Sequence, residues 1–288
     1  MSRIAARFAE LRALNRAGFI PFITAGDPDS ESSFEILQKL AGVGADLIEL
    51  GMPFSDPMAD GPAIQASSMR ALKAGMTVKG TLHLVERFRA RDSATPIVLM
   101  GYYNPIHAYG AEHFLRDAAH AGVDGLIIVD LGPEEDSTFR VAAAKLDIDT
   151  VRLATPTTDD KRLTTVLYGA GGFLYYVSVA GVTGTKTFAS TDVSAAIARI
   201  RRASALPCAV GFGIKTPEQA AEIACLADAA VVGSAIVTRI EDALRHGKAH
   251  GDIVDDALNF CRRLADAVHK ARDKTPPILT SDVLKTRP

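Results

Sequence analysis

The sequence predicts an α/β fold, a single (β/α)8 TIM barrel with an extra helix at the N-terminus. Eight short apolar segments recur along the chain, and longer stretches with helical spacing separate them. The segments are apolar on both faces, as is typical of parallel strands that are buried from both sides. Eight strand–helix alternations in roughly 250 residues favour a closed barrel over an open doubly wound sheet.

The first segment, MSRIAARFAELRAL, predicts the extra helix. It places Ile4, Phe8, Leu11 and Leu14 at helical intervals. Its arginines also resemble those of a targeting peptide, but it lacks a continuous hydrophobic region and contains Glu10. We therefore expect an amphipathic helix of the folded protein.

The strands and helices then alternate in order. The predicted strands are FIPFIT at 19–24, DLIELG at 46–51, IVLMGY at 97–102, GLIIVD at 125–130, IDTVRLA at 148–154, FLYYVS at 173–178, CAVGFG at 208–213 and AAVVGSA at 229–235. Helical spacing is clear in SSFEILQKLAGVGA, EHFLRDAAHAGV, DVSAAIARIRRA and PEQAAEIACLA. No interdomain linker interrupts this pattern, so we expect one catalytic barrel domain over 1–272. The Pro-rich, polar segment 273–288 is expected to be a flexible tail.

Composition argues against several classes of partner and site. A formal net charge of -2 gives no electrostatic reason to expect nucleic acid, and no apolar run reaches the roughly 18 residues of a membrane span. Cys208, Cys225 and Cys261 are widely spaced and odd in number, which fits neither a disulfide framework nor a metal site. The seven histidines form no metal pattern either. We expect a cytoplasmic protein without a metal.

A carboxylate inside the second predicted strand is the main candidate for chemistry. Glu49 lies among Leu47, Ile48 and Leu50, and desolvating an unpaired carboxylate costs several kcal/mol or more. Alternate residues of a strand share a face, so Glu49 follows Leu47 toward the barrel interior if that face points inward. It would then lie at the end of the barrel where such enzymes place their active sites. The pattern leaves a structural carboxylate, bonded to a lysine or a backbone amide, as an equal alternative.

Three aspartates flank this strand and differ in their expected roles. Asp60 lies in the following loop, where Asp before Gly is by itself ordinary turn chemistry. Asp56, in a Ser-Asp-Pro sequence, is expected to be a turn residue or a partner contact. Asp46 precedes the strand at its opposite end and is expected to be structural.

Glycine-rich segments after the last three strands predict a phosphate site. Phosphate binding needs backbone N–H donors, close approach without Cβ atoms and preferably a helix N-terminus. The loops after the seventh and eighth strands are the usual phosphate site of a barrel. The candidates are Gly184 in AGVTGTK, Gly213 in GFGIKTPEQ, and Gly233 and Ser234 in VVGSAIV. None of these segments has the spacing of a Walker loop or a dinucleotide fingerprint.

Aromatic residues near the strand ends have two interpretations each. Tyr175, in the sixth strand, either meets Glu49 across the barrel or fills a core layer, and the pattern alone favours the core. Phe22 and Phe212 are either ordinary core residues or flat walls for an aromatic ligand. Tyr102 either lines the open end of the barrel or belongs to a packed rim.

Several of these segments together resemble one family. LIELGMPFSDPMADG is similar to the signature segment of the tryptophan synthase α subunit. The resemblance extends in order, to about residue 270, through PFITAGDP, GPAIQASSMRAL, MGYYNPI, YYVSVAGVTGTK, VGFGIKTPEQA and VVGSAIV. It implies a barrel lyase that cleaves indole-3-glycerol phosphate reversibly to indole and glyceraldehyde 3-phosphate, in the last steps of tryptophan biosynthesis. It also implies an α2β2 heterotetramer, in which indole passes to a β subunit that carries pyridoxal phosphate, with no cofactor in this chain.

The resemblance also implies roles for individual residues. Glu49 and Asp60 match the catalytic pair of the family, and Thr183 matches a residue of the mobile loop that closes over the site and bonds the aspartate. The phosphate cradle is matched by Gly184, Gly213, Gly233 and Ser234, and the surroundings of the indole by Phe22, Tyr175 and Phe212. One departure is Gly132 in DLGPEED, where family members often have a second proline. We expect it to loosen the loop that faces the β subunit.

The reaction explains why an isolated carboxyl group is useful. Cleavage requires a proton at carbon C3 of the indole and removal of a proton from the neighbouring hydroxyl, and one carboxyl group can do both. We therefore expect burial to raise the pKa of Glu49 toward neutrality. Asp60, in a more polar setting, is expected to remain ionised and to accept the indole N–H.

Three other functions compete with this hypothesis. A different barrel enzyme acting on phosphorylated sugars, such as an isomerase, would keep the glycine cradle but not Asp60. An interaction subunit would use the loop PFSDP at 53–57, which we expect to be exposed and stiffened by proline, to activate a β partner. A standalone indole-3-glycerol-phosphate lyase of the same fold is the nearest alternative.

Overall fold

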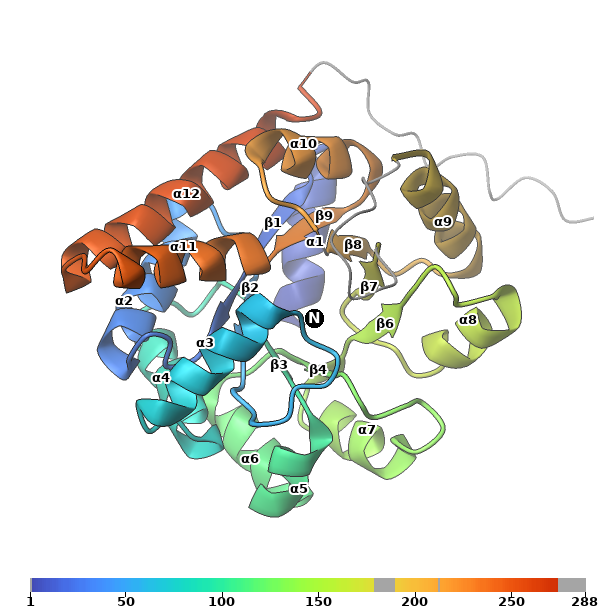
Figure 1. Cartoon of the computed structure of the whole chain (residues 1–288). Helices are drawn as coiled ribbons and strands as arrows, with labels where there is room; N and C mark the ends of the chain where they lie inside the picture. The colour runs from blue at the N-terminus through green and yellow to red at the C-terminus, as the bar shows by residue number, and fades with distance from the viewer. Residues whose placement is uncertain (1, 179–189, 212, 274–288) are drawn as a thin grey trace, which may run out of the picture.

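The computed structural model describes residues 2–178, 190–211 and 213–273 and contains a parallel barrel surrounded by helices (Figure 1). Its strands are β1 (Gly18–Thr24), β2 (Ile48–Gly51), β3 (Ile97–Gly101), β4 (Gly125–Ile128), β5 (Asp149–Thr150), β6 (Arg152–Ala154), β7 (Leu174–Val177), β8 (Cys208–Gly211) and β9 (Ala229–Val232). Its helices are α1 (Arg3–Ala13), α2 (Ser30–Leu40), the 3-10 helix η1 (Ala41–Val43), α3 (Pro62–Lys73), α4 (Val78–Arg89), α5 (Tyr103–Tyr109), α6 (Ala111–Ala121), α7 (Ser137–Ala144), α8 (Asp160–Leu167), α9 (Ser190–Ala203), α10 (Pro217–Leu226), α11 (Ser234–Arg245) and α12 (His250–Lys270).

The nine strand segments correspond to the eight predicted strands because the fifth strand is broken. The order in the sheet is β5-β4-β3-β2-β1-β9-β8-β7-β6, and every recorded pairing is parallel. Only Val151 separates β5 from β6, and its N–H donates to Leu126 O at 3.0 Å. The sheet therefore closes on itself through this one strand, and the predicted α/β barrel is confirmed.

Two apolar layers hold the barrel together. The inner layer fills the barrel with side chains such as Leu47, Val98 and Val231. The outer layer, which includes Ile48, Leu50 and their neighbours on the helices, lies between strands and helices. Successive residues of β2 thus enter different layers, which is why a strand buried on both faces is apolar throughout.

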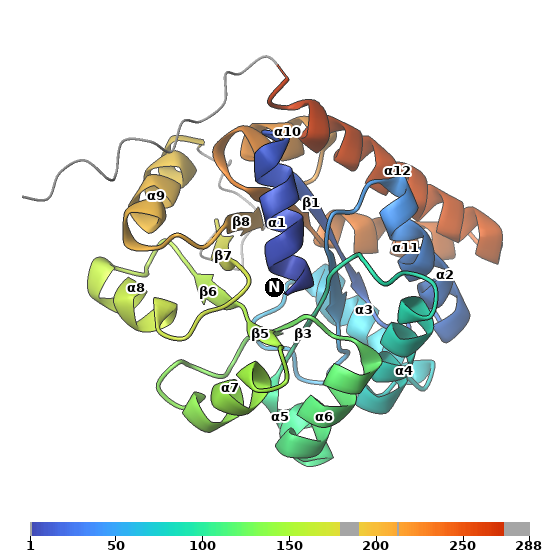
Figure 2. The same ribbon diagram turned by 180° about the vertical axis from the view of Figure 1, so that it is seen from behind.

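Helix α1 covers one end of the barrel, as the view in Figure 2 shows. Ile4, Phe8 and Leu11 are buried and belong to the inner layer, and the Phe8 ring lies 5.7 Å from that of Phe173. Ser2 caps the helix by accepting a hydrogen bond from Ala5 N–H. The predicted N-terminal helix therefore closes the end opposite the predicted active site.

The last helix fixes the far end of the described chain. One face of α12 is buried, and α12 packs against α10 and α11. The Arg272 side chain, which is buried, donates to Ala224 O at 2.8 Å and to Ala227 O at 2.5 Å. Among the described helices, none is long and apolar enough to cross a membrane.

Candidate active site

Glu49 points into the barrel near its open end. In the sheet it is paired with Phe22 of β1 and Val98 of β3, and Val98 belongs to the inner layer. Residues paired across neighbouring strands share a face, so Glu49 lies above the floor formed by Leu47, two residues earlier on the same face. The sequence-based expectation that this carboxyl faces the interior is correct.

The Glu49 carboxyl is buried without a compensating partner. Glu49 is 2% exposed, and among the described residues no hydrogen bond or cation acts on its carboxyl group. Burial, reinforced by the negative charge of Asp60, raises the pKa of Glu49 from its ordinary 4.5 to about 8. At neutral pH the group is therefore mainly a protonated acid that a modest change of environment can ionise. The sequence also allowed a structural carboxylate held by a lysine. In the described part of the chain no lysine holds Glu49.

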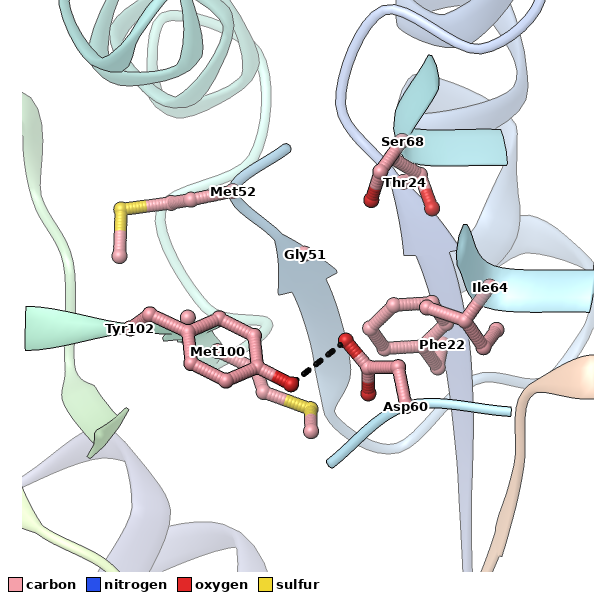
Figure 3. A pocket seen from close by; sticks show the side chains of 10 residues that line it. Phe22, Thr24, Gly51, Met52, Asp60, Ile64, Ser68, Met100 and Tyr102 are labelled. Atoms are coloured by element: carbon pink, nitrogen blue, oxygen red, sulfur yellow. Dashed lines mark hydrogen bonds between the residues drawn. The ribbon is translucent and has the colours of Figure 1, made fainter. Parts of the chain in front are cut away.

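Asp60 enters the same space from the loop between β2 and α3. Tyr102 Oη, from the end of β3, donates to Asp60 Oδ2 at 3.1 Å and accepts from Ala59 N–H at 3.0 Å (Figure 3). Burial raises the pKa of Asp60 to about 6, and the Tyr102 hydrogen bond opposes that rise. Asp60 is thus mainly ionised at pH 7, as expected, although burial moves its pKa closer to neutrality than a polar setting would.

Tyr175 and Phe22 complete the walls of this space. Tyr175 belongs to the inner layer, and burial, with smaller contributions from the charges of Glu49 and Asp60, raises its pKa well above the ordinary value. The Phe22 ring lies so close to the backbone that a Cβ atom on Gly51 would be 2.6 Å from Phe22 Cζ. The alternative that Tyr175 reaches the Glu49 side of the barrel, rather than serving only as core, therefore fits the structure.

A small cavity lies beside Asp60, Phe22 and Tyr102. Its volume is about 10 Å³, and it is lined by Phe22, Thr24, Gly51, Met52, Asp60, Ile64, Ser68, Met100, Gly101 and Tyr102. In Figure 3 the Asp60 carboxyl lies between the Tyr102 and Phe22 rings. This volume holds about one water molecule, so an aromatic ligand requires the surrounding side chains to move apart.

The predicted phosphate-binding residues lie partly within the described chain. Gly233 and Ser234 are at the N-terminus of α11, which no side chain caps. Gly213 follows β8 and has φ +82°, a conformation that favours glycine. Because β8 and β9 are adjacent and parallel, their following segments emerge at the same end of the barrel. A Cβ atom on Gly233 would be 3.2 Å from Phe22 Cβ, so this helix terminus adjoins the cavity wall.

Comparison with known proteins gives the relatives of this chain. The tryptophan synthase alpha chain family matches residues 8–269. The structure is similar to that of tryptophan synthase subunit alpha from Legionella pneumophila str. Paris, with 38% identity and a TM-score of 0.86, over 93% of this chain and 98% of that one. This chain belongs to the tryptophan synthase alpha chain family. A chain in an aminoacrylate-bound tryptophan synthase structure from M. tuberculosis is also similar, with 32% identity and a TM-score of 0.82, over 93% of this chain and 100% of that one.

Membership of the tryptophan synthase alpha chain family confirms the resemblance inferred from LIELGMPFSDPMADG. The structure brings Glu49, Asp60 and Tyr175 together at one end of the barrel. Thr183, Gly184 and Phe212 lie outside the described residues. Their assignment to the closing loop, the phosphate cradle and the indole pocket stays a prediction.

The structure decides between the two roles open to Tyr102 and corrects one expectation. Tyr102 lines the cavity at the open end of the barrel, where its hydroxyl donates to Asp60, and its position after β3 is the sequence signal for that role. The expectation that the loop PFSDP is exposed is wrong for its two prolines, which the structure buries. Pro53 and Pro57 are buried, and Phe54 is half-buried with its ring 5.4 Å from that of Tyr102. Only the tip around Ser55, with Asp56, is exposed.

Proposed function

We infer that this chain is the alpha-chain lyase of tryptophan synthase and cleaves indole-3-glycerol phosphate to indole and glyceraldehyde 3-phosphate. The family match over residues 8–269 supports the reaction. The observation that carries the mechanism is the dry, unpaired carboxyl of Glu49 beside Asp60. An isomerase acting on phosphorylated sugars would not need Asp60 at this position.

Glu49 is proposed to move both protons of the reaction. A protonated Glu49 delivers its proton to C3 of the indole ring, which makes the bond to the glyceryl chain breakable. The resulting carboxylate accepts the proton of the hydroxyl on the neighbouring carbon as that carbon becomes an aldehyde, so the acid is regenerated. A pKa of about 8 suits this exchange, because the acid form predominates at neutral pH and the ionised form remains accessible.

Asp60 is proposed to stabilise the positive charge that develops on the protonated ring. With a pKa of about 6 it is mainly ionised at neutral pH, and the Tyr102 hydrogen bond fixes one carboxylate oxygen while the other stays available for the indole N–H. A fixed negative charge in a dry site stabilises such a charge far more than it would in water.

The ends of the substrate are proposed to bind different walls. The uncapped N-terminus of α11, with Gly233 and Ser234, offers backbone N–H donors and the positive end of a helix to the phosphate, together with Gly213 and Gly184. Phe22, Tyr175 and Phe212 are proposed to surround the indole ring, with Thr183 above it.

The chain is proposed to act with a β subunit that carries pyridoxal phosphate, in an α2β2 heterotetramer in the cytoplasm. Tryptophan synthase structures among its relatives support a β partner, and the free thiols of Cys208, Cys225 and Cys261 fit a reducing compartment. We propose that the catalytic domain ends near residue 272, because Arg272 still docks on α10, and we assign no function to the tail.

An assay of indole release from indole-3-glycerol phosphate tests the proposed reaction directly. The full-length chain should release indole and glyceraldehyde 3-phosphate in equal amounts. Glu49→Gln should stop this while phosphate-ligand binding stays largely intact, and retained turnover would refute the proton shuttle. Adding a pyridoxal-phosphate β subunit should raise the rate of indole formation; an unchanged rate together with no co-purification would favour the standalone lyase.

A further inference from the structure

We propose that Asp130 is a positioning residue for this reaction, which orients Asp60 through Tyr102. The proposal rests on the proposed function and adds a residue outside the cavity to it. Asp130 lies in the loop between β4 and α7 and is exposed. Its Oδ1 accepts a hydrogen bond from Tyr103 N–H at 2.7 Å.

The hydrogen bond from Tyr103 fixes the backbone next to Tyr102. Tyr103 is the first residue of α5, and the residue at the N-cap position, Tyr102, makes no side-chain cap bond. The carboxylate of Asp130 therefore serves the first turn of α5 from a different loop, where a short polar N-cap residue would normally do so. Because the two tyrosines are consecutive, the bond limits rotation of the backbone that carries the Tyr102 ring.

The loop that carries Asp130 is itself anchored. Val129 N–H donates to Gly101 O at 2.9 Å, which continues the β3–β4 pairing past the last strand residue. At its other end, Asp136 is buried and forms an ion pair with Arg152 of β6. Arg162 of α8 pairs with Glu134 in the same loop. Such anchoring at both ends allows the loop to hold Asp130 in one place.

Tyr102 carries this constraint to the catalytic aspartate. Its hydroxyl bridges Asp60 Oδ2 at 3.1 Å and Ala59 N–H at 3.0 Å, so it fixes both the carboxylate and the backbone of the loop after β2. The Tyr103 ring packs edge-on against Phe139 of α7, at 5.9 Å, which gives the same segment a second support. The order of influence is therefore Asp130, then the backbone of α5, then Tyr102 and finally Asp60.

Charged and titratable groups lie on several elements around this chain of contacts. Glu49 of β2 and Tyr175 of β7 interact electrostatically with Asp60, and the His107 ring of α5 lies 5.8 Å from that of Tyr103. Burial, followed by the carboxylate of Asp60 and with a smaller contribution from Asp130, raises the pKa of Tyr102, so its hydroxyl stays protonated and donates. A loosened Tyr102 would deprive Asp60 of the hydrogen bond that lowers its pKa.

Asp130→Ala and Asp130→Asn in the full-length chain test the proposal. Loss of the acceptor in Asp130→Ala should lower kcat for indole release about tenfold, the value of roughly one well-placed hydrogen bond. KM for the phosphorylated substrate should change less than about twofold, since the phosphate end lies on α11. The acidic limb of the kcat–pH profile should move upward by about half a unit or more. Asp130→Asn keeps an acceptor oxygen and should restore most of kcat.

A double-mutant cycle and a matched control decide the outcome. In a Tyr102→Phe background, Asp130→Ala should have no further effect, because both changes remove the same support. Asp117→Ala is the matched control. It removes an exposed carboxylate of α6 that accepts a 2.6 Å hydrogen bond from Tyr109, the last residue of α5, and it should leave kcat unchanged. A folded Asp130→Ala protein with the wild-type kcat and pH profile, or effects that add in the double mutant, would overturn the proposal. If the wild type itself releases no indole, the proposed function fails first.

Discussion

Asp124 at the closed end of the barrel and Glu49 at its open end are buried carboxyl groups with opposite surroundings. At the end closed by α1, Asp124 is buried and accepts from Arg3 Nη1 at 2.8 Å, Arg89 Nη2 at 2.6 Å and Ile97 N–H at 2.8 Å. Each oxygen has a cationic donor, as the cost of burying a charge requires.

For Glu49 and Asp60 the same cost is left largely uncompensated. Among the described residues Glu49 has no cationic partner, and the side chain of Asp60 has a single neutral donor, Tyr102. Burial therefore raises the pKa of Glu49 and of Asp60, whereas buried carboxylates such as Asp124 at the closed end and Asp136 in the loop after β4 have cationic partners. The difference identifies which buried acids stabilise the fold and which are kept for proton transfer.

Glu49→Gln should give the largest functional effect. The amide keeps the shape of the side chain but neither donates nor accepts the transferred proton, so kcat should fall by about 1,000-fold or more. Indole release under saturating substrate measures this. Asp46→Asn is the matched control at the closed end, where Asp46 is bound by Arg16 and Phe19 N–H. It should lower stability but retain most of the turnover, and equal losses of activity in both variants would contradict the comparison.

Asp124→Asn should give the largest loss of stability. It leaves Arg89, with a side chain only 10% exposed, without its anionic partner. Breaking a buried ion pair by removing one partner costs about 3 to 5 kcal/mol. Chemical denaturation should show this decrease in the free energy of unfolding. A change below about 1 kcal/mol would mean that the closed end does not depend on its ion pairs.

The stability of Glu49→Gln relative to wild type should depend on pH. The folded pKa of Glu49, about 8, lies above its ordinary 4.5, so its favourable contribution is complete below pH 4.5 and is lost as pH rises through 8. The variant lacks this titration. The two proteins should unfold similarly near pH 4.5, and the variant should be more stable by at least about 2 kcal/mol near pH 8.5. A difference that does not change with pH would show that Glu49 is not desolvated.

The fold was largely predictable because it depends on local patterns. All eight strands and the N-terminal helix follow from apolar spacing, which a strand or helix must have to bury a face. The break at Val151 was not predictable in this way. It depends on bonds from distant partners: Val151 N–H bonds to Leu126 O, and Gly171 N–H bonds to Thr150 O at 2.8 Å.

Candidate site residues were predictable where a residue type contradicts its surroundings or recurs after neighbouring strands. Glu49 was a candidate because a carboxylate interrupts an apolar strand, and the glycines because they follow the last three strands, while Asp60 needed the family resemblance. Apart from its position after β3, the sequence around Tyr102 contains nothing that marks this tyrosine as a site residue, and its partner Asp60 lies 42 residues away. The burial of Pro53 and Pro57 is likewise a tertiary effect, since a proline-containing loop usually lies at the surface.

Tyr102→Phe should give the smallest effect of these substitutions, and it tests how far Asp60 depends on its hydrogen bond. It removes the one side-chain donor to Asp60 among the described residues while keeping the ring that packs on Phe54. Without the hydrogen bond, the pKa of Asp60 should rise above about 6, so kcat should fall about tenfold at pH 7 and less at pH 8.5. Tyr168→Phe, at an exposed tyrosine, is the control and should leave the profile unchanged. An equal loss at both pH values would mean that Tyr102 orients Asp60 without controlling its ionisation, and the contrast with Asp124 would then rest on Glu49 alone.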